Sequence, residues 1–210
     1  TGKPLPSVDF TAVRGVEGIK EAEYDLAGTK VRVAVTSGLE NASKLLDMIK
    51  SGGYRIHDLE GAELRAYVGV NVTEPALADV RVRQAIAFAL DRERIIAEVF
   101  RGSGYPLNVP WPKTSPAWDE SRNTRYSRDV SKAKELVAQV GKPPTLPLTF
   151  GPGYDELAQI VQANLAEAGI EVTLDPVDGA TFIKQLTGQQ FRGLWVTDHS
   201  WAQFVPSTLT

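Results

Sequence analysis

Near the end of the chain, two opposite charges flank a segment that could bind an ionic ligand. The residues from Arg192 to Asp198 are Arg-Gly-Leu-Trp-Val-Thr-Asp, an apolar, β-prone run between a guanidinium and a carboxylate. A charge at a strand end that faces a cleft is well placed for charge-assisted hydrogen bonds with an ionic ligand. The alternative is that Arg192 and Asp198 are solvated ends of an edge strand, because strand ends are commonly polar.

Aromatic side chains lie within and after the same segment. Trp195, Trp201 and Phe204 could stack on the face of a sugar ring. The other interpretation is that these rings fill the core or pack on a further C-terminal part of the protein. The residues predicted to bind a ligand are therefore Arg192, Trp195, Asp198 and Trp201, with core packing as the alternative for the rings.

Composition excludes several kinds of chemistry. The 210 residues contain 26 acidic and 23 basic side chains, a net charge of −3, so no general positive field attracts nucleic acid. There is no cysteine, which excludes disulfides, thiolate-bound zinc, iron–sulfur clusters and a cysteine nucleophile. His57 and His199 are far apart and have no acidic residue at ligand spacing, so we predict neither a metal site nor a cofactor.

Other candidate motifs favour structure over catalysis. Glu60, Glu63, Asp175 and Asp178 are paired in sequence, but nothing places them on either side of a scissile bond. The Gly151-Pro152-Gly153 turn could place an anion at a helix N-terminus, but it lacks the Gly-Lys-Ser/Thr of a nucleotide loop and is typical of a tight turn. We predict no catalytic residue and no enzyme activity.

The elements that must position these residues follow from hydrophobic periodicity. Residues 21–26 and 30–35 predict a hairpin, and 39–49 a helix that ends at Gly52-Gly53. The rest alternates strands with helices, which indicates an α/β fold. The predicted strands are 63–70, 145–150, 170–174 and 193–197, and the predicted helices are 79–90, 91–100, 129–140, 155–168 and 181–186.

Two connections carry further predictions. The strand–helix–strand unit over 145–174 predicts two parallel strands with a right-handed crossover. Residues 103–128 have no periodicity and predict a long loop, in which Trp111 and Trp118 indicate packing rather than disorder. No apolar run is long enough to span a bilayer, so we expect no membrane insertion.

Residues 67–75, Tyr-Val-Gly-Val-Asn-Val-Thr-Glu-Pro, and 79–93, Asp-Val-Arg-Val-Arg-Gln-Ala-Ile-Ala-Phe-Ala-Leu-Asp-Arg-Glu, carry a resemblance. They are similar to the signature of the family 5 extracellular solute-binding proteins, the peptide, nickel and oligosaccharide receptors of ABC importers. The resemblance extends over about 63–210 through Trp111-Pro112, 126–138 and 165–178. It implies the second lobe of such a receptor, cut short at the C-terminus.

The signature residues have structural rather than ligand-binding chemistry. Asp79 is expected to cap a helix, and Arg81 and Arg83 to point to solvent or to nearby carbonyl groups. The small face formed by Ala85, Ala87 and Ala89 would let the helix lie close to a sheet. For the ligand, the resemblance implies that Asp198 pairs with a peptide α-amine and Arg192 with its carboxylate; the aromatic continuation after Asp198 departs from the family's usual pattern.

The first 50 or so residues resemble a different family. Residues 13–22 and 37–46 are similar to a stretch of iron-only hydrogenases that precedes a cysteine-rich cluster loop, and here no such cysteines follow. Hydrogenase activity is therefore excluded, and the pattern suggests an engineered or artefactual chimera without ligand function as the alternative to a receptor. The predicted division is a hairpin-plus-helix segment over 1–55 and a solute-binding lobe over 56–210.

These inferences converge on a non-catalytic solute-binding lobe. The expected architecture is a single lobe of the periplasmic-binding-protein type II kind, with a mixed sheet flanked by helices. The resemblance implies a peptide or an oligosaccharide as ligand, an ABC permease as partner of the full-length parent, and a periplasmic or extracellular, membrane-attached location.

Overall fold

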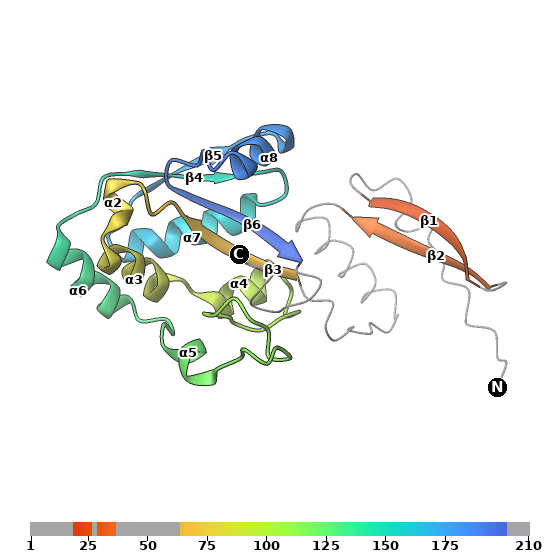
Figure 1. The fold of residues 1–210 in the computed structure, drawn as a ribbon, viewed down its shortest axis with the longest axis horizontal. Coiled ribbons are helices and arrows are strands. Elements are labelled where there is room, and N and C mark those ends of the chain that lie inside the picture. Colours follow the sequence, from red (N-terminus) through yellow and green to blue (C-terminus); the bar gives the residue numbers. More distant parts are fainter. Residues whose placement is uncertain (1–18, 27–28, 37–63, 201–210) are drawn as a thin grey trace. The chain divides into compact units, whose positions relative to one another are not determined.

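The computed structural model describes residues 19–26, 29–36 and 64–200 (Figure 1). The chain divides into two units, Thr1–His57 and Asp58–Thr210, and each is described by itself. The predicted helix over 39–49 lies outside the described residues, as do His57, Glu60, Glu63, Trp201 and Phe204.

The described part of the first unit is an antiparallel hairpin. Strand β1, Ile19–Leu26, pairs with β2, Thr29–Thr36, in a register that sets Leu26 opposite Thr29 and Ile19 opposite Thr36. The two-residue connection and the alternating valines of the second strand are typical of such a hairpin, so this prediction is confirmed.

The second unit contains a four-stranded mixed sheet in the order β3-β6-β4-β5. Its strands are β3 Leu64–Val70, β4 Leu146–Phe150, β5 Val172–Pro176 and β6 Leu194–Ser200. β6 runs antiparallel to β3 and parallel to β4, and β5 runs parallel to β4. The predicted parallel strands and the mixed sheet are confirmed.

One face of this sheet is apolar, and its central strands are fully buried there. Leu148, Leu194 and Val196 have no exposed side-chain surface, and α7, Asp155–Glu167, contacts the sheet through β4 and β5. Gly169 ends the helix at a positive φ of 82°. Ile170 is also completely buried and its N–H donates to Leu165, so it closes the helix and the next strand begins two residues later than predicted.

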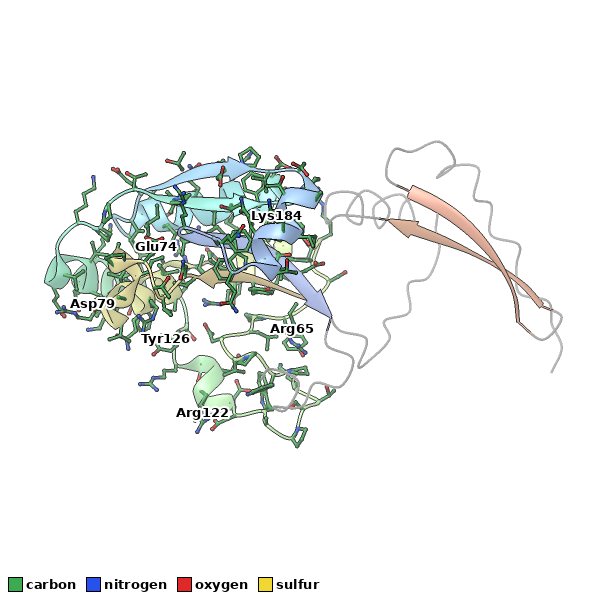
Figure 2. The ribbon with its side chains drawn as sticks, turned by 45° about the horizontal axis from the view of Figure 1, so that its top comes forward. Arg65, Glu74, Asp79, Arg122, Tyr126 and Lys184 are labelled. Carbon is green, nitrogen blue, oxygen red and sulfur yellow. The ribbon has the colours of Figure 1, made fainter. Side chains whose placement is uncertain are left out.

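Three helices precede the long loop: α2 Pro75–Ala78, α3 Val80–Ala89 and α4 Arg92–Glu98. Asp79 caps α3 by accepting from the Arg81 N–H at 2.8 Å, and Asp91 caps α4 by accepting from the Arg94 N–H at 3.0 Å. The Arg81 guanidinium also pairs with Asp79, and these hydrogen bonds lower the pKa of Asp79 to about 2. Figure 2 shows Asp79 on the helical side of the unit, away from Arg65 on β3.

The small face of α3 meets a helix rather than the sheet, which corrects the sequence interpretation. Ala85 and Ala89 are completely buried, and α3 packs mainly against α6, Val130–Val140, which contributes Ala133 and Leu136. Small side chains allow two helix backbones to approach closely just as they allow a helix to approach a sheet, so the residue types alone did not distinguish the two. Arg83 donates to the carbonyls of Leu77 and Ala78, as expected.

The loop over 103–128 contains a short helix that periodicity did not reveal, α5 Glu120–Thr124, which is capped by Asp119. At five residues it is too short to show an apolar stripe. Arg92 fixes the loop to α3, because its guanidinium donates to the carbonyls of Leu107 and Ala87. Burial lowers the pKa of Arg92 to about 10, so it stays charged at neutral pH.

Aromatic residues of the same loop are half-buried. Lys113 lies 5.0 Å from the ring centre of Tyr105 and 6.0 Å from that of Trp118. Tyr126 meets Phe88 of α3 edge-to-face at 5.2 Å. The loop is therefore packed, as its tryptophans predicted.

The last helix, α8 Gly179–Thr187, leads into β6, and Asp178 caps it by accepting from the Thr181 N–H at 3.0 Å. Within the described ranges, no helix combines the length and the apolar character that crossing a membrane requires.

Candidate functional site

The carboxylate of Asp198 lies near the end of β6, where it meets a tyrosine from another element. The Tyr154 hydroxyl donates to Asp198 Oδ1 at 2.5 Å, and both residues are only partly buried. Tyr154 directly precedes α7, after the turn that leaves β4. The parallel strands β4 and β6 end at the same edge of the sheet, and ligands of open α/β sheets bind outside the carboxyl ends of the strands.

Electrostatics keep this tyrosine protonated. The pKa of Tyr154 is raised above its ordinary value, first by burial and then by its hydrogen bond to Asp198 and by that residue's charge, while Thr197 has a smaller opposite effect. Burial also raises the pKa of Tyr67, the nearby Trp195 side chain acts against this, and the charge of Asp198 adds to it. Tyr154 therefore remains a neutral hydrogen-bond donor beside the Asp198 carboxylate, an arrangement suited to a cation, whereas Tyr67, opposite Thr197, lies on the other face of the sheet.

Trp195 occupies the sheet face opposite the buried apolar one. It pairs with Gly69 of β3, and a Cβ atom on Gly69 would lie only 2.0 Å from Trp195 Cε2, so the indole lies directly on the glycine backbone. The ring of Phe191 stacks on the indole at 4.6 Å and 15°. Because the indole is held between Gly69 and Phe191, its faces serve packing, in agreement with the core-packing alternative.

The indole N–H of Trp195 stands out in this arrangement. Its Nε1 is buried and has no hydrogen-bond partner of good geometry in the described part of the chain. The indole nevertheless lies close enough to Tyr67 to act against the rise in the pKa of that residue. An unsatisfied buried donor costs stability. The contacts of the ring with Gly69 and Phe191 are therefore what fix Trp195 in place.

Arg192 and Asp198 have different surroundings. It is exposed and borders a polar groove of about 850 Å³ with Thr149, Asp175, Gln185 and Gln190. Six residues of extended chain separate the two charges, a span on the order of 20 Å. This span joins the two α-carbons, and Asp198 does not line the groove that Arg192 borders, so the two charges have separate surroundings.

The remaining candidates have structural partners or lie outside the described residues. Asp175 accepts from the Thr149 hydroxyl at 2.8 Å, and Asp178 caps α8. Trp201 and the side chain of His199 are not described. Among the residues that are, no three acidic or histidine side chains gather in a way that could hold a metal ion.

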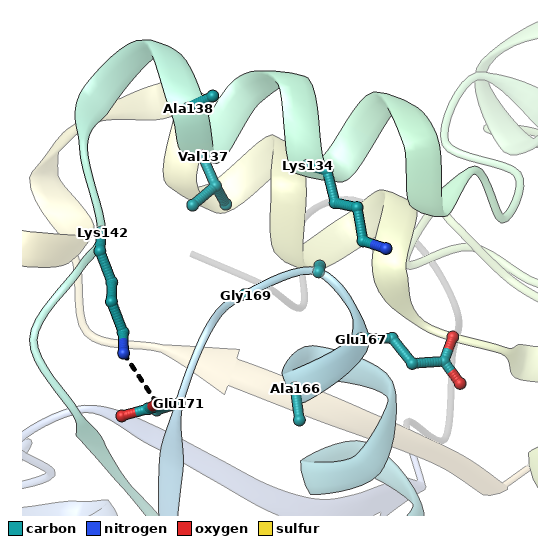
Figure 3. A pocket seen from close by; sticks show the side chains of 9 residues that line it. Lys134, Val137, Ala138, Lys142, Ala166, Glu167, Gly169 and Glu171 are labelled. Carbon is teal, nitrogen blue, oxygen red and sulfur yellow. Dashed lines mark hydrogen bonds and ion pairs between the residues drawn. The ribbon is translucent and has the colours of Figure 1, made fainter.

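A second hollow, of about 550 Å³, lies between α6 and the end of α7 (Figure 3). Val137 and Ala166 line it, as do Lys142 and Glu171, which form an ion pair at 2.8 Å. Both charges of this pair are largely exposed, and exposed pairs contribute little. Neither Trp195 nor Asp198 lines this hollow or the polar groove.

The sequence interpretation missed Tyr154 and Tyr67. One signal was available, because Tyr154 follows the Gly-Pro-Gly turn at the carboxyl end of a predicted strand, where binding residues commonly lie. Tyr67 could be associated with Trp195 only through the register of β3 and β6, which sets Tyr67 opposite Thr197 and Gly69 opposite Trp195.

Comparison with known families agrees with this fold. The sequence profile described as "Bacterial extracellular solute-binding proteins, family 5 Middle" matches residues 31–210. The chain belongs to the family 5 bacterial extracellular solute-binding proteins. The match begins at residue 31, inside the segment predicted to be hydrogenase-like.

Several individual proteins are similar to this chain. "Probable di/tripeptide-binding protein 5" of Pseudomonas aeruginosa is 33% identical over 133 residues, which are 59% of this chain and 24% of that protein. "Heme-binding protein A" of Haemophilus influenzae is 27% identical over 129 residues, 57% of this chain and 23% of that protein. The chain thus spans about a quarter of the length of these relatives.

A solved structure supports the fold. DppA of Helicobacter pylori, solved with the peptide STSA, matches this chain with a TM-score of 0.67 at 18% identity. The match covers 90% of this chain and 44% of the DppA chain. The fold is thus that of a periplasmic-binding-protein lobe.

The resemblance to hydrogenases also has a counterpart. A 60-residue stretch is 45% identical to the "Periplasmic [Fe] hydrogenase large subunit" of Nitratidesulfovibrio vulgaris, covering 29% of this chain and 14% of that protein.

Proposed function

We propose that this chain is a peptide-binding lobe of an ABC-importer substrate-binding protein, and that Asp198 binds the α-ammonium group of the peptide. The observation that carries the proposal is the Asp198 carboxylate, held by the Tyr154 hydroxyl at 2.5 Å and still partly exposed at the carboxyl edge of the sheet. A charge-assisted hydrogen bond to an ammonium is among the stronger contacts available to such a group.

The surroundings of Asp198 favour an amine over a neutral sugar. Tyr154 remains protonated, so it adds no second negative charge, and the Trp195 faces are engaged by Gly69 and Phe191 rather than free to stack on a sugar. A peptide ligand also agrees with the name of the Pseudomonas relative. Arg192 borders a separate polar groove, so we assign it no role in binding a di- or tripeptide.

The wider role of the protein follows from its family. As a solute-binding protein it acts without catalysis, delivers its ligand to an ABC permease, and works in the periplasm or at the outer face of the membrane. The second lobe needed to enclose the ligand belongs to the remaining length of such a receptor. The division into 1–55 and 56–210 and a chimeric origin of the first segment stay predictions.

The test uses NMR titration of the chain with trialanine, N-acetyl-trialanine and, separately, xylotriose. The indole N–H signal of Trp195 is read together with the amide signals of β6. Trialanine should give saturable shifts near Asp198, and acetylation should weaken binding at least tenfold because it removes the positive charge. Xylotriose should give none.

Two variants separate the charges at the ends of β6. Asp198→Asn keeps the shape of the side chain and should abolish the preference for the free amine. Arg192→Gln is the matched control and should bind as the unchanged chain does. Equal binding of both peptides by the unchanged chain, or loss of the preference in Arg192→Gln rather than Asp198→Asn, contradicts the proposal.

A further inference from the structure

The backbone of Tyr154 begins α7 as that of any residue at this position would, whereas its phenol makes a specific contact with Asp198. Its carbonyl accepts from Ala158 N–H at 2.8 Å and so begins α7, but its side chain makes no capping hydrogen bond. Helix N-cap positions favour Ser, Thr, Asp or Asn for that purpose. A tyrosine at this position therefore offers the helix nothing that a small polar residue would not supply better.

The turn before Tyr154 determines where the phenol goes. Gly153 has a φ of 86°, a conformation that residues with a Cβ rarely adopt, and it follows Pro152, whose ring restricts the backbone. This stiff turn joins the end of β4 to α7, beside the end of β6. It thereby brings the Tyr154 hydroxyl to Asp198, which is 44 residues away in the sequence.

The Asp198 carboxylate needs such a restraint if it is to be ordered. Rotation about the bond to an aspartate carboxyl group is broad rather than confined to sharp wells. A side chain that is only half-buried gains little restraint from packing. The described ranges supply one side-chain hydrogen bond to this carboxylate, from Tyr154.

We propose that Tyr154 is a positioning residue for ligand binding: its hydroxyl holds one oxygen of Asp198 and so presents the other to the ammonium group of the peptide. This inference rests on the proposed function. Fixing the carboxylate before the ligand arrives avoids part of the ordering cost of binding. The raised pKa of Tyr154 is consistent with a hydroxyl that remains a donor throughout the neutral and mildly alkaline range.

The test removes the hydroxyl and keeps the ring. Tyr154→Phe should weaken binding of trialanine about tenfold, the scale of one hydrogen bond to a charged group, and leave N-acetyl-trialanine unchanged. Tyr126→Phe is the matched control, because it also removes one tyrosine hydroxyl, which contacts Gln84 in another part of the unit. Two-dimensional NMR spectra establish that both variants are folded.

A double-mutant cycle shows whether the hydroxyl acts through Asp198. In the Asp198→Asn background, Tyr154→Phe should have no further effect on the preference for the free amine. An equal loss of trialanine affinity in both backgrounds overturns the inference, because the hydroxyl would then act elsewhere. A preference that Tyr154→Phe leaves unchanged overturns it too.

A readout without ligand keeps this inference separate from the proposed function. The carboxyl carbon resonance of Asp198 should move in Tyr154→Phe and stay in place in Tyr126→Phe. An unmoved resonance in Tyr154→Phe overturns the positioning role whatever the ligand. If the resonance moves but the unchanged chain does not distinguish trialanine from its acetylated form, the proposed function fails and the Tyr154–Asp198 contact stands.

Discussion

The two ends of β6 carry opposite charges in very different surroundings. At one end, Asp198 accepts a hydrogen bond from Tyr154. At the other, Arg192 is exposed on the border of a polar groove. In the sequence, both charges are simply polar residues at the ends of an apolar segment. Within the described residues, the carboxylate is held by a side chain from another element and the guanidinium is not.

The difference follows from the elements that adjoin each end. The carboxyl end of β6 lies beside the turn that links β4 to α7, so it meets side chains presented by that turn. The amino end follows α8 after a short connection, and Arg192 there borders a groove lined largely by polar side chains. Order at a charged group thus depends on the neighbouring elements more than on the charge itself.

The largest expected effect comes from Gly69, which supports the Trp195 ring between the two ends. Gly69→Ala should destabilise the protein by about 3 kcal/mol, because the new Cβ would overlap the indole and force the ring to move. Urea unfolding with tryptophan fluorescence measures both effects. Gly151→Ala is the control, since its Cβ would meet Phe182 at an ordinary 3.5 Å; an equal loss in both variants contradicts the assigned role of Gly69.

A smaller difference should separate the two charges. Asp198→Ala removes the acceptor of the half-buried Tyr154 hydroxyl and should cost about 1–2 kcal/mol, a value reduced by the exposure of the pair. Arg192→Ala should change stability by less than about 0.5 kcal/mol, as is usual for exposed residues without such features. Chemical denaturation of both variants gives the values, and a larger cost for Arg192→Ala would reverse the comparison.

The smallest effect is a shift in tyrosine ionisation. The pKa of Tyr154 is raised in the folded protein, so its contribution to stability is present below pH 10, about the ordinary value, and is lost as the pH rises toward the folded value. Absorbance titration at alkaline pH should show a late-ionising tyrosine. Asp198→Asn should move this ionisation to lower pH and Arg192→Gln should not; the same curve for all three proteins would show that Asp198 does not contribute.

Much of the second unit could be predicted because its signals are local. Asp79 and Asp91 cap helices as an acidic residue before an apolar stripe predicts, and Gly141 and Gly169 end helices with positive φ. The short helix α5 was missed since five residues carry no readable period. The small face of α3 was assigned to the sheet, but it packs against helix α6. Small side chains allow close packing against either kind of element, so they do not identify the partner.

The candidate site, too, was predicted only in part from the sequence. Asp198 was identified as a charge at a strand end, and its spacing from Trp195 was visible along the chain. Tyr154 became part of the site only because the turn after β4 ends beside β6, and the register of β3 with β6 places Tyr67 on the Trp195 face rather than beside Asp198.

Residue types and periodicity therefore specified the helices, the strands, the caps and the kind of charge at each end of β6, since these depend on neighbours within a few residues. The partners of those charges depend on strand order and register, which bring together groups 44 residues apart or more. Only the folded chain could decide that Asp198 is held by a tyrosine while Arg192, six residues before it, borders an open groove.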